Sequence, residues 1–138
     1  MLVLAKDNTA TPAVYSSGDG SDPISVSLLL DGTGDPASIT GSPATDLFVW
    51  ADDDTGNIGS YSDVTASISG SDPGITWELS LDNATWAATI EVGTLDVSAS
   101  YHTMQIYARA SALNNGTVLT ANYTTADVVV AATENPSA

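Results

Sequence analysis

The sequence has no cysteine, very little positive charge and no long apolar run. The absence of cysteine excludes a disulfide framework and thiol chemistry. Lys and Arg total 2 residues against 17 Asp and Glu, and the formal net charge is −15. Such a chain lacks the cations that nucleic-acid phosphates or an anionic membrane surface attract. No apolar run reaches the roughly 18 residues that a spanning helix needs. Nucleic acids and membranes are therefore not expected partners.

Residues able to carry out catalysis are equally scarce. His102 is the only histidine, and it falls near the end of a predicted strand. A hydrolytic triad would need serine and aspartate partners for it, yet no G-x-S-x-G motif is present. The sequence also has no P-loop and no dinucleotide fingerprint. With 17 acids, two carboxylates meet easily by chance, so a glycosidase pair is not supported. We predict no catalytic residue and no enzyme activity.

The strongest pattern in the chain runs from Ile75 to Ala110. The segment ITWELSLD, residues 75–82, is apolar at every second position, and the segment HTMQIYARA, residues 102–110, repeats the alternation. A period of two places neighbouring side chains on opposite faces, which is typical of half-buried strands. Shorter patterns of the same kind predict further strands at 24–30, 37–40, 45–51, 60–69, 85–90, 118–123 and 127–132.

This spacing predicts an all-β domain. Seven to nine short strands, separated by Gly, Pro, Asp and Asn, are typical of an antiparallel β-sandwich. A small β-barrel is the main alternative. A chain of 138 residues suggests one domain. The residues predicted to form its core are Leu28, Val49, Trp77, Leu79, Ile106, Ala108 and Val130.

The first 23 residues differ in composition from the rest and are predicted to form an extended N-terminal arm and linker. The sandwich then spans 24–132, and 133–138 form a polar tail. A Ser/Gly/Asp-rich stretch at 16–23 separates the apolar residues of the arm from the first sandwich strand. The arm could add a strand to the sheet of a neighbouring protein. The alternative is that residues 2–5 form the first strand of their own sandwich. The predicted partner-binding residues of the arm are Leu2, Val3, Leu4, Lys6, Val14 and Tyr15.

One acidic loop is a weak candidate for a metal site. The stretch DDDTGN, residues 52–57, resembles the start of an EF-hand loop but lacks its distal glutamate. Asp52, Asp54 and Asn57 would supply the oxygen ligands of a calcium ion. The alternative, which we favour, is a solvated acidic turn. No other cofactor is indicated.

The aromatic and cationic side chains have mainly structural interpretations. Trp50, Trp77 and Trp86 fall in or beside predicted strands, where an aromatic residue is more often core than a carbohydrate platform. Arg109 is expected to be held by a carboxylate or to stack on an aromatic ring. Its candidate partners are Glu78, Asp82, Tyr107 and Trp86.

The acidity of the chain comes mainly from aspartate and is accompanied by very little lysine. Asp outnumbers Glu by 14 to 3, and lysine occurs once. Aspartate is favoured in turns, which explains part of this bias. The near-absence of lysine is not explained by turns, and it favours a halophilic or marine setting where counter-ions screen self-repulsion.

Three segments together resemble a known class of domain. The stretch SLDNATW, residues 80–86, is similar to the S-x-D-x-x-x-W hairpin of immunoglobulin-like and fibronectin-III-like modules. The stretch IYARA, residues 106–110, resembles the I-Y-x-R strand that follows in them, and residues 128–130 fit the closing strand. The resemblance covers about residues 24–132. Such domains are common in tailed-phage and related virion proteins, including capsid decoration proteins, so the resemblance implies an immunoglobulin-like sandwich.

The resemblance also implies a function. We expect a non-enzymatic structural virion protein, such as a capsid decoration protein or a head or tail accessory protein. Its partner would be the major capsid protein or another lattice protein, with self-association into multimers on that lattice. The first seven residues are too short for a secretion signal, which favours assembly in a host cytoplasm and a place on the virion surface. The alternative is an extracellular adhesion module, on a cell surface or secreted, that binds a partner such as a glycan.

Overall fold

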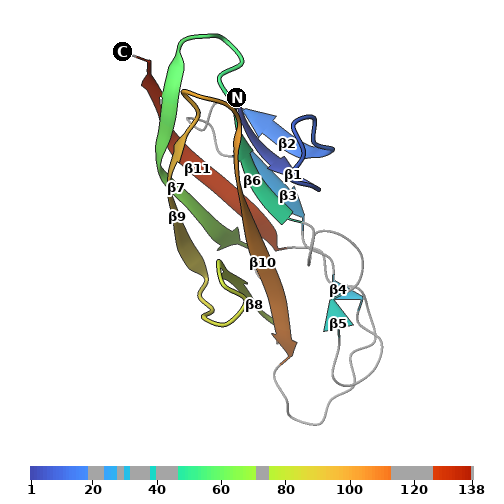
Figure 1. The fold of residues 1–138 in the computed structure, drawn as a ribbon. Helices are drawn as coiled ribbons and strands as arrows, with labels where there is room; N and C mark the ends of the chain where they lie inside the picture. The colour runs from blue at the N-terminus through green and yellow to red at the C-terminus, as the bar shows by residue number, and fades with distance from the viewer. Residues whose placement is uncertain are drawn as a thin grey trace.

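The structure is a computed structural model that describes residues 1–18, 24–27, 30–31, 38–39, 47–70, 75–112 and 126–137. Two antiparallel sheets lie face to face and enclose one core (Figure 1), as expected for a β-sandwich. The sheets do not close on each other, so the barrel alternative is wrong. The described residues contain no helix able to cross a membrane.

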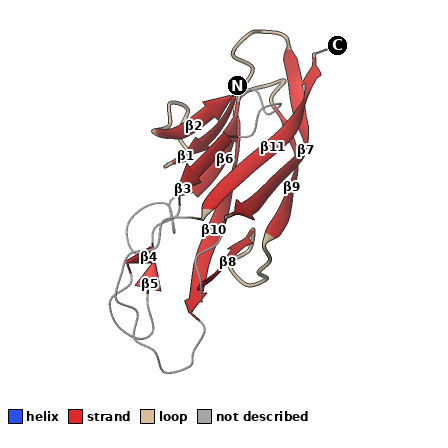
Figure 2. Ribbon diagram, turned by 180° about the vertical axis from the view of Figure 1, so that it is seen from behind, coloured by secondary structure: helices blue, strands red, loops and turns tan. Residues whose placement is uncertain are grey.

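The first sheet has five strands in the order β2-β1-β6-β10-β8. These are β1 (Leu2–Ala5), β2 (Val14–Gly18), β6 (Leu47–Ala51), β8 (Ile75–Ser80) and β10 (His102–Ala112). The second sheet has four strands in the order β3-β11-β7-β9. These are β3 (Ile24–Ser27), β7 (Ile58–Ser69), β9 (Thr89–Asp96) and β11 (Asp127–Pro136). A separate ribbon pairs β4 (Leu30–Asp31) with β5 (Ser38–Ile39), and Figure 2 shows it beyond one end of the sandwich.

The core forms where the alternating apolar residues of the two sheets meet. Leu79 and Ile106 of the five-stranded sheet are fully buried, and Tyr61 and Leu95 of the four-stranded sheet are fully buried in the same core. Six predicted core residues are confirmed as buried, and the seventh, Leu28, lies outside the described residues. The six are Val49, Trp77, Leu79, Ile106, Ala108 and Val130. Burying one such aliphatic side chain stabilises the fold by about 1.5–3 kcal/mol.

The N-terminal segment is part of this core, which corrects the prediction of a separate arm. β1 lies between β2 and β6, with Leu2 paired to Ala51 and Leu4 paired to Val49. Leu2 and Leu4 are 0% exposed and belong to the main core. The sandwich therefore begins at residue 2, as in the alternative considered above. An apolar strand gains far more from two neighbouring strands and a core than from water, which explains this placement.

The C-terminal boundary also differs from the prediction. Residues 133–136 were expected in a polar tail, but β11 continues through them and pairs with β7 as far as Pro136 opposite Ile58. Both chain ends then reach the loop between β6 and β7 (Figures 1 and 2). The Ser137 amide donates to the Asn57 carbonyl at 2.8 Å, and the Met1 ammonium donates to the Asp52 carbonyl at 2.7 Å.

The segment after β8 changes sheet, although the sequence predicts a strand at 85–90. Ala87 forms a single bridge to Leu79, with N···O distances of 2.7 and 3.0 Å. The Ile68 amide then donates to the Ala88 carbonyl at 2.9 Å, beside β7 of the other sheet. The segment thus crosses the edge of the sandwich, and the long strand β9 starts only at Thr89.

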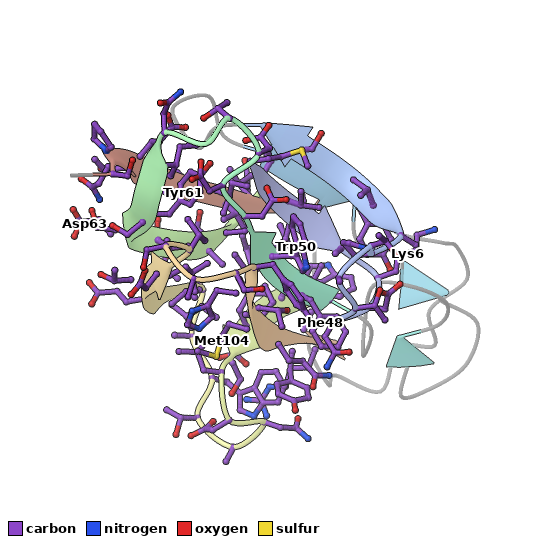
Figure 3. All side chains as sticks on the ribbon, turned by 45° about the horizontal axis from the view of Figure 1, so that its top comes forward. Lys6, Phe48, Trp50, Tyr61, Asp63 and Met104 are labelled. Carbon is purple, nitrogen blue, oxygen red and sulfur yellow. The ribbon has the colours of Figure 1, made fainter. Side chains whose placement is uncertain are left out.

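β9 is an edge strand with an irregular register. Its pairing with β7 shifts on both sides of Val64, which lies opposite Gly93. Gly93 has φ +99°, a conformation that favours glycine, and Asp63 has φ 51°. These shifts are typical of β-bulges, which bend and twist an edge. Asp63 points outward from the sandwich (Figure 3).

The buried position of β1 gives a first testable expectation. Leu4→Ala should lower the free energy of unfolding by about 2–5 kcal/mol, because it leaves a cavity in the main core. Val14→Ala is the matched control in the neighbouring edge strand. Val14 is 46% exposed, so its truncation should change stability by no more than about 0.5 kcal/mol. Urea unfolding curves measure both. Deletion of residues 1–15 should abolish cooperative unfolding, and a truncated protein that unfolds like the full chain would contradict this account.

Candidate functional site

The turn after β8 is held by one carboxylate. Asp82 Oδ1 accepts hydrogen bonds from the amides of Ala84 and Thr85 at 2.9 and 2.8 Å. It also accepts the Ser80 hydroxyl at 2.8 Å. Asn83 follows with φ 57°, a left-handed conformation that asparagine tolerates. These hydrogen bonds lower the pKa of Asp82 to about 2, with the Thr85 amide as the largest cause.

Arg109 of β10 contacts both this turn and the neighbouring strand β8. Its guanidinium lies 4.3 Å from the centre of the Trp86 ring. Its Nε and Nη2 donate to Glu78 Oε1 at 3.2 and 3.0 Å. Two of its four candidate partners, Glu78 and Trp86, are therefore confirmed. One group of contacts across β8, the turn and β10 thus includes Asp82 and Trp86 of the 80–86 stretch and Arg109 of the 106–110 stretch.

A row of aromatic rings follows the outer side of the five-stranded sheet. Trp50 lies opposite Thr103 and Phe48 opposite Gln105 in the pairing of β6 with β10. Tyr107 is two residues further along β10, on the same face. We call the outer surface of Phe48, Trp50, Tyr101, Tyr107 and Trp86 the aromatic face. Figure 3 shows Phe48 and Trp50 following one another along β6.

Trp50 forms the buried floor of the aromatic face. It is only 3% exposed and packs with Val3 and Ala5 of β1 in a second apolar cluster. Its Nε1 donates to the Thr9 carbonyl at 3.0 Å, so the loop between β1 and β2 lies against it. Tyr101 stacks on its ring at a centroid distance of 5.7 Å and remains 37% exposed.

The loop over Trp50 is itself ordered by an aspartate. Asp7 Oδ1 accepts the Thr9 amide at 3.1 Å and the Thr9 hydroxyl at 2.6 Å, and its Oδ2 accepts the Ala13 amide at 3.1 Å. These bonds, the Thr9 hydroxyl first, lower the pKa of Asp7 below its usual value. The Asp7 hydrogen bonds thereby hold in place the Thr9 carbonyl that accepts the Trp50 indole N–H.

Negative charge is distributed unequally between the two sheets. Among the described strands, the five-stranded sheet carries one acid, Glu78, which is paired with Arg109. The four-stranded sheet carries five acids, at Asp63, Glu91, Asp96, Asp127 and Glu134. Four of these five are exposed, and Asp127 is half-buried. Within its strands, a protein with a formal charge of −15 thus carries one paired acid on the sheet of the aromatic face and five acids on the other sheet.

The predicted arm residues are divided between the interior and the surface. Leu2, Val3 and Leu4 are completely buried and are not accessible to a partner. Lys6 and Val14 are exposed, and Tyr15 is half-buried at the edge of the sheet. The Lys6 ammonium lies 5.0 Å from the centre of the Tyr15 ring. We call Lys6, Val14 and Tyr15 the edge patch.

The predicted calcium ligands do not form a ligand set. Asp54 Oδ1 accepts the Met1 ammonium at 2.7 Å, and Asp52 Oδ1 lies 3.4 Å from the same nitrogen. The Asn57 side-chain Nδ2 instead donates to the Thr55 carbonyl at 3.2 Å. Within the described ranges there is no cluster of three or more His, Asp or Glu that would hold a metal ion.

The same end of the molecule has a pocket of about 370 Å³. Its polar walls include Asp54, Glu134 and Tyr61. The Tyr61 ring is fully buried, and its hydroxyl donates to Glu134 Oε2 at 3.5 Å. Burial raises the pKa of Tyr61 above its usual range, and the nearby carboxylates add to the shift. The tyrosine is therefore a protonated donor at neutral pH.

His102 lies at the start of β10 and contacts backbone. Its Nδ1 is 3.4 Å from the Asp96 carbonyl oxygen. The Asp96 carboxylate accepts the Ser98 hydroxyl at 2.7 Å and the Ser98 amide at 3.0 Å, which lowers its pKa. The histidine thus caps a strand end, in keeping with the structural interpretation of the sequence.

Phe48 and Tyr101 were not predicted as site residues, and Tyr107 was predicted only as a possible partner of Arg109 and as part of the IYARA stretch. The sequence does show that Tyr101 and Tyr107 share one face of the strand, because residues 101, 103, 105, 107 and 109 alternate with its apolar residues. Recognising the aromatic face needed the register of β6 against β10, which brings Phe48 and Trp50 beside that row.

Comparison with known proteins finds no match to this chain among protein-family models, curated proteins or solved structures. Within the described residues, the aromatic face and the edge patch both combine accessible apolar side chains with strands that carry few acids.

The turn aspartate predicts a pH dependence of stability. The pKa of Asp82 falls from its ordinary 3.8 to about 2 on folding. A depressed folded-state pKa contributes stability that is fully present above about pH 4 and is lost as the pH falls through about 2. Asp82→Asn should therefore melt at a lower temperature than the wild type at pH 7, with a smaller difference at pH 2. Thermal melts followed by circular dichroism measure this. An equal difference at both pH values would contradict the assignment.

The charge of the chain predicts a response to salt. The Debye length shortens from about 10 Å at 0.1 M to about 3 Å at 1 M, which screens repulsion among the acids. The melting temperature should rise over this range in NaCl. Asp63→Asn with Glu91→Gln, on the four-stranded sheet, should raise it at 0.1 M and reduce the further gain from salt. A wild-type melting temperature that stays flat or falls would remove the support for a saline setting.

Proposed function

We propose that this protein is a non-catalytic structural module of a virus particle, which decorates a capsid or a related lattice. The observation that carries the proposal is the connected unit formed by Asp82, Trp86, Arg109 and Glu78. These residues include the motif positions that resemble immunoglobulin-like virion domains. Their contacts give Asp82, Trp86 and Arg109 a structural role, which supports the resemblance.

The edge patch is the proposed contact with the lattice. Lys6 is the only lysine of the chain, and Val14 is one of the few large apolar side chains with high exposure, at 46%. β2 itself carries no acid, so an opposing protein surface meets little repulsion there. The proposed contact keeps Lys6, Val14 and Tyr15 of the predicted arm. It no longer includes Leu2, Val3 and Leu4, which are buried in the sandwich. Repetition on a lattice would strengthen weak single contacts.

The acidic four-stranded sheet would then face the surroundings of the particle. Exposed carboxylates on that side keep the surface hydrated and repel other particles of the same kind. Self-association between neighbouring copies on the lattice stays part of the proposal, with the major capsid protein or another lattice protein as the main partner.

Particle binding tests this proposal directly. Antibody raised against the purified chain should label intact virus particles prepared from the source of the gene, and the chain should co-sediment with them in a density gradient. In reconstitution on particles stripped of the protein, the double variant Lys6→Glu with Val14→Asp should bind at least about tenfold more weakly. Leu81→Ala is the control, because Leu81 is 37% exposed and lies in the turn after β8. Absence of the chain from all particle fractions would overturn the proposal.

A further inference from the structure

We propose that the aromatic face is a binding site for an uncharged polysaccharide. This inference does not depend on the virion assignment, since it rests on the outer surface of the five-stranded sheet alone. The site runs along β10 from Tyr101 to Arg109, with Phe48 and Trp50 of β6 beside it.

The spacing of the rings suits an extended chain of sugar residues. Residues two apart on a strand are separated by about 6.7 Å, since each residue advances roughly 3.3–3.4 Å. Successive rungs along β10 carry Trp50 beside Thr103, Phe48 beside Gln105, and then Tyr107 itself. The next rung carries Arg109, whose guanidinium covers Trp86. The rungs of Gln105, Tyr107 and Arg109 thus present the half-buried rings of Phe48, Tyr107 and Trp86. The one acid on these rungs, Glu78 opposite Arg109, is held by that guanidinium.

Polar groups alternate with the rings. The Tyr107 hydroxyl donates to Gln105 Oε1 at 3.3 Å, so both side chains lie across the face. Glu78 and Arg109 form an acceptor and donor pair at one end. A surface of apolar rings with interspersed hydrogen-bonding groups matches a sugar, which has apolar C–H faces and equatorial hydroxyls.

Charge decides among the possible occupants. The acids elsewhere on the chain, at a formal charge of −15, repel nucleic acids and anionic polysaccharides. A basic polymer would be attracted to the acidic four-stranded sheet rather than to this face, where the one acid of the strands is already paired with Arg109. A purely apolar partner would leave the polar groups between the rings without hydrogen bonds, which is costly. A neutral glycan is not repelled by the acids, is not attracted to the other sheet and can hydrogen-bond with the polar groups between the rings.

The test is affinity electrophoresis of the purified full chain in gels that contain one neutral polysaccharide each. The probes are hydroxyethyl cellulose, xyloglucan, galactomannan, mannan, laminarin and soluble starch, with alginate as the anionic comparison. We expect at least one neutral probe to retard the protein and alginate to have no effect. Tryptophan fluorescence titration with the retarding probe then gives a Kd, since Trp86 lies at one end of the site.

Two substitutions locate the binding. Tyr101→Ala and Tyr107→Ala should each raise the Kd about tenfold, and the double variant should abolish retardation. Leu81→Ala is the matched control, because Leu81 is 37% exposed like Tyr101 but lies outside the face. Near-UV circular dichroism confirms that each variant is folded. Three results would overturn the inference: no retardation of the wild type by any neutral probe, unchanged binding by the folded double variant, or equal binding of alginate. None of these bears on binding to virus particles.

Discussion

The insertion of β1 between β2 and β6 is the contact on which the rest of the structure depends. Each side of this four-residue strand is buried against a different set of residues. Leu2 and Leu4 face the main core, while Val3 and Ala5 face Trp50 in the second cluster. Main-chain pairing to β6 fixes the register of these contacts. The strand therefore links the interior of the sandwich to the floor of the aromatic face.

The sequence predicted the fold class well because alternation is a local signal. The strands around Trp77, Leu79 and Ile106 alternate over many residues, and their burial follows directly from the period of two. Leu2–Ala5 shows no such alternation, because all four residues are buried. A run that is apolar on both faces suits a central strand as well as an isolated anchor. Only the pairing partners, far away in the sequence, distinguish the two.

The candidate surfaces were harder to predict than the core. The sequence left four candidate partners for Arg109, namely Glu78, Asp82, Tyr107 and Trp86, and the structure shows the contacts with Glu78 and Trp86 together. The aromatic face joins residues 48 and 50 to residues 101–109, and no local pattern relates these segments. The unequal distribution of acids is equally non-local, since it depends on which strands share a sheet.

The bulged pairing of β7 with β9 has a consequence for behaviour at high concentration. An edge strand presents unpaired backbone groups that invite another strand, and this is a common route to aggregation. On β9 the register shifts near Gly93 interrupt any regular ladder, while Glu91 and Asp96 place charges along the same strand. A crowded array of such molecules would therefore stay free of sheet-to-sheet fusion along this edge.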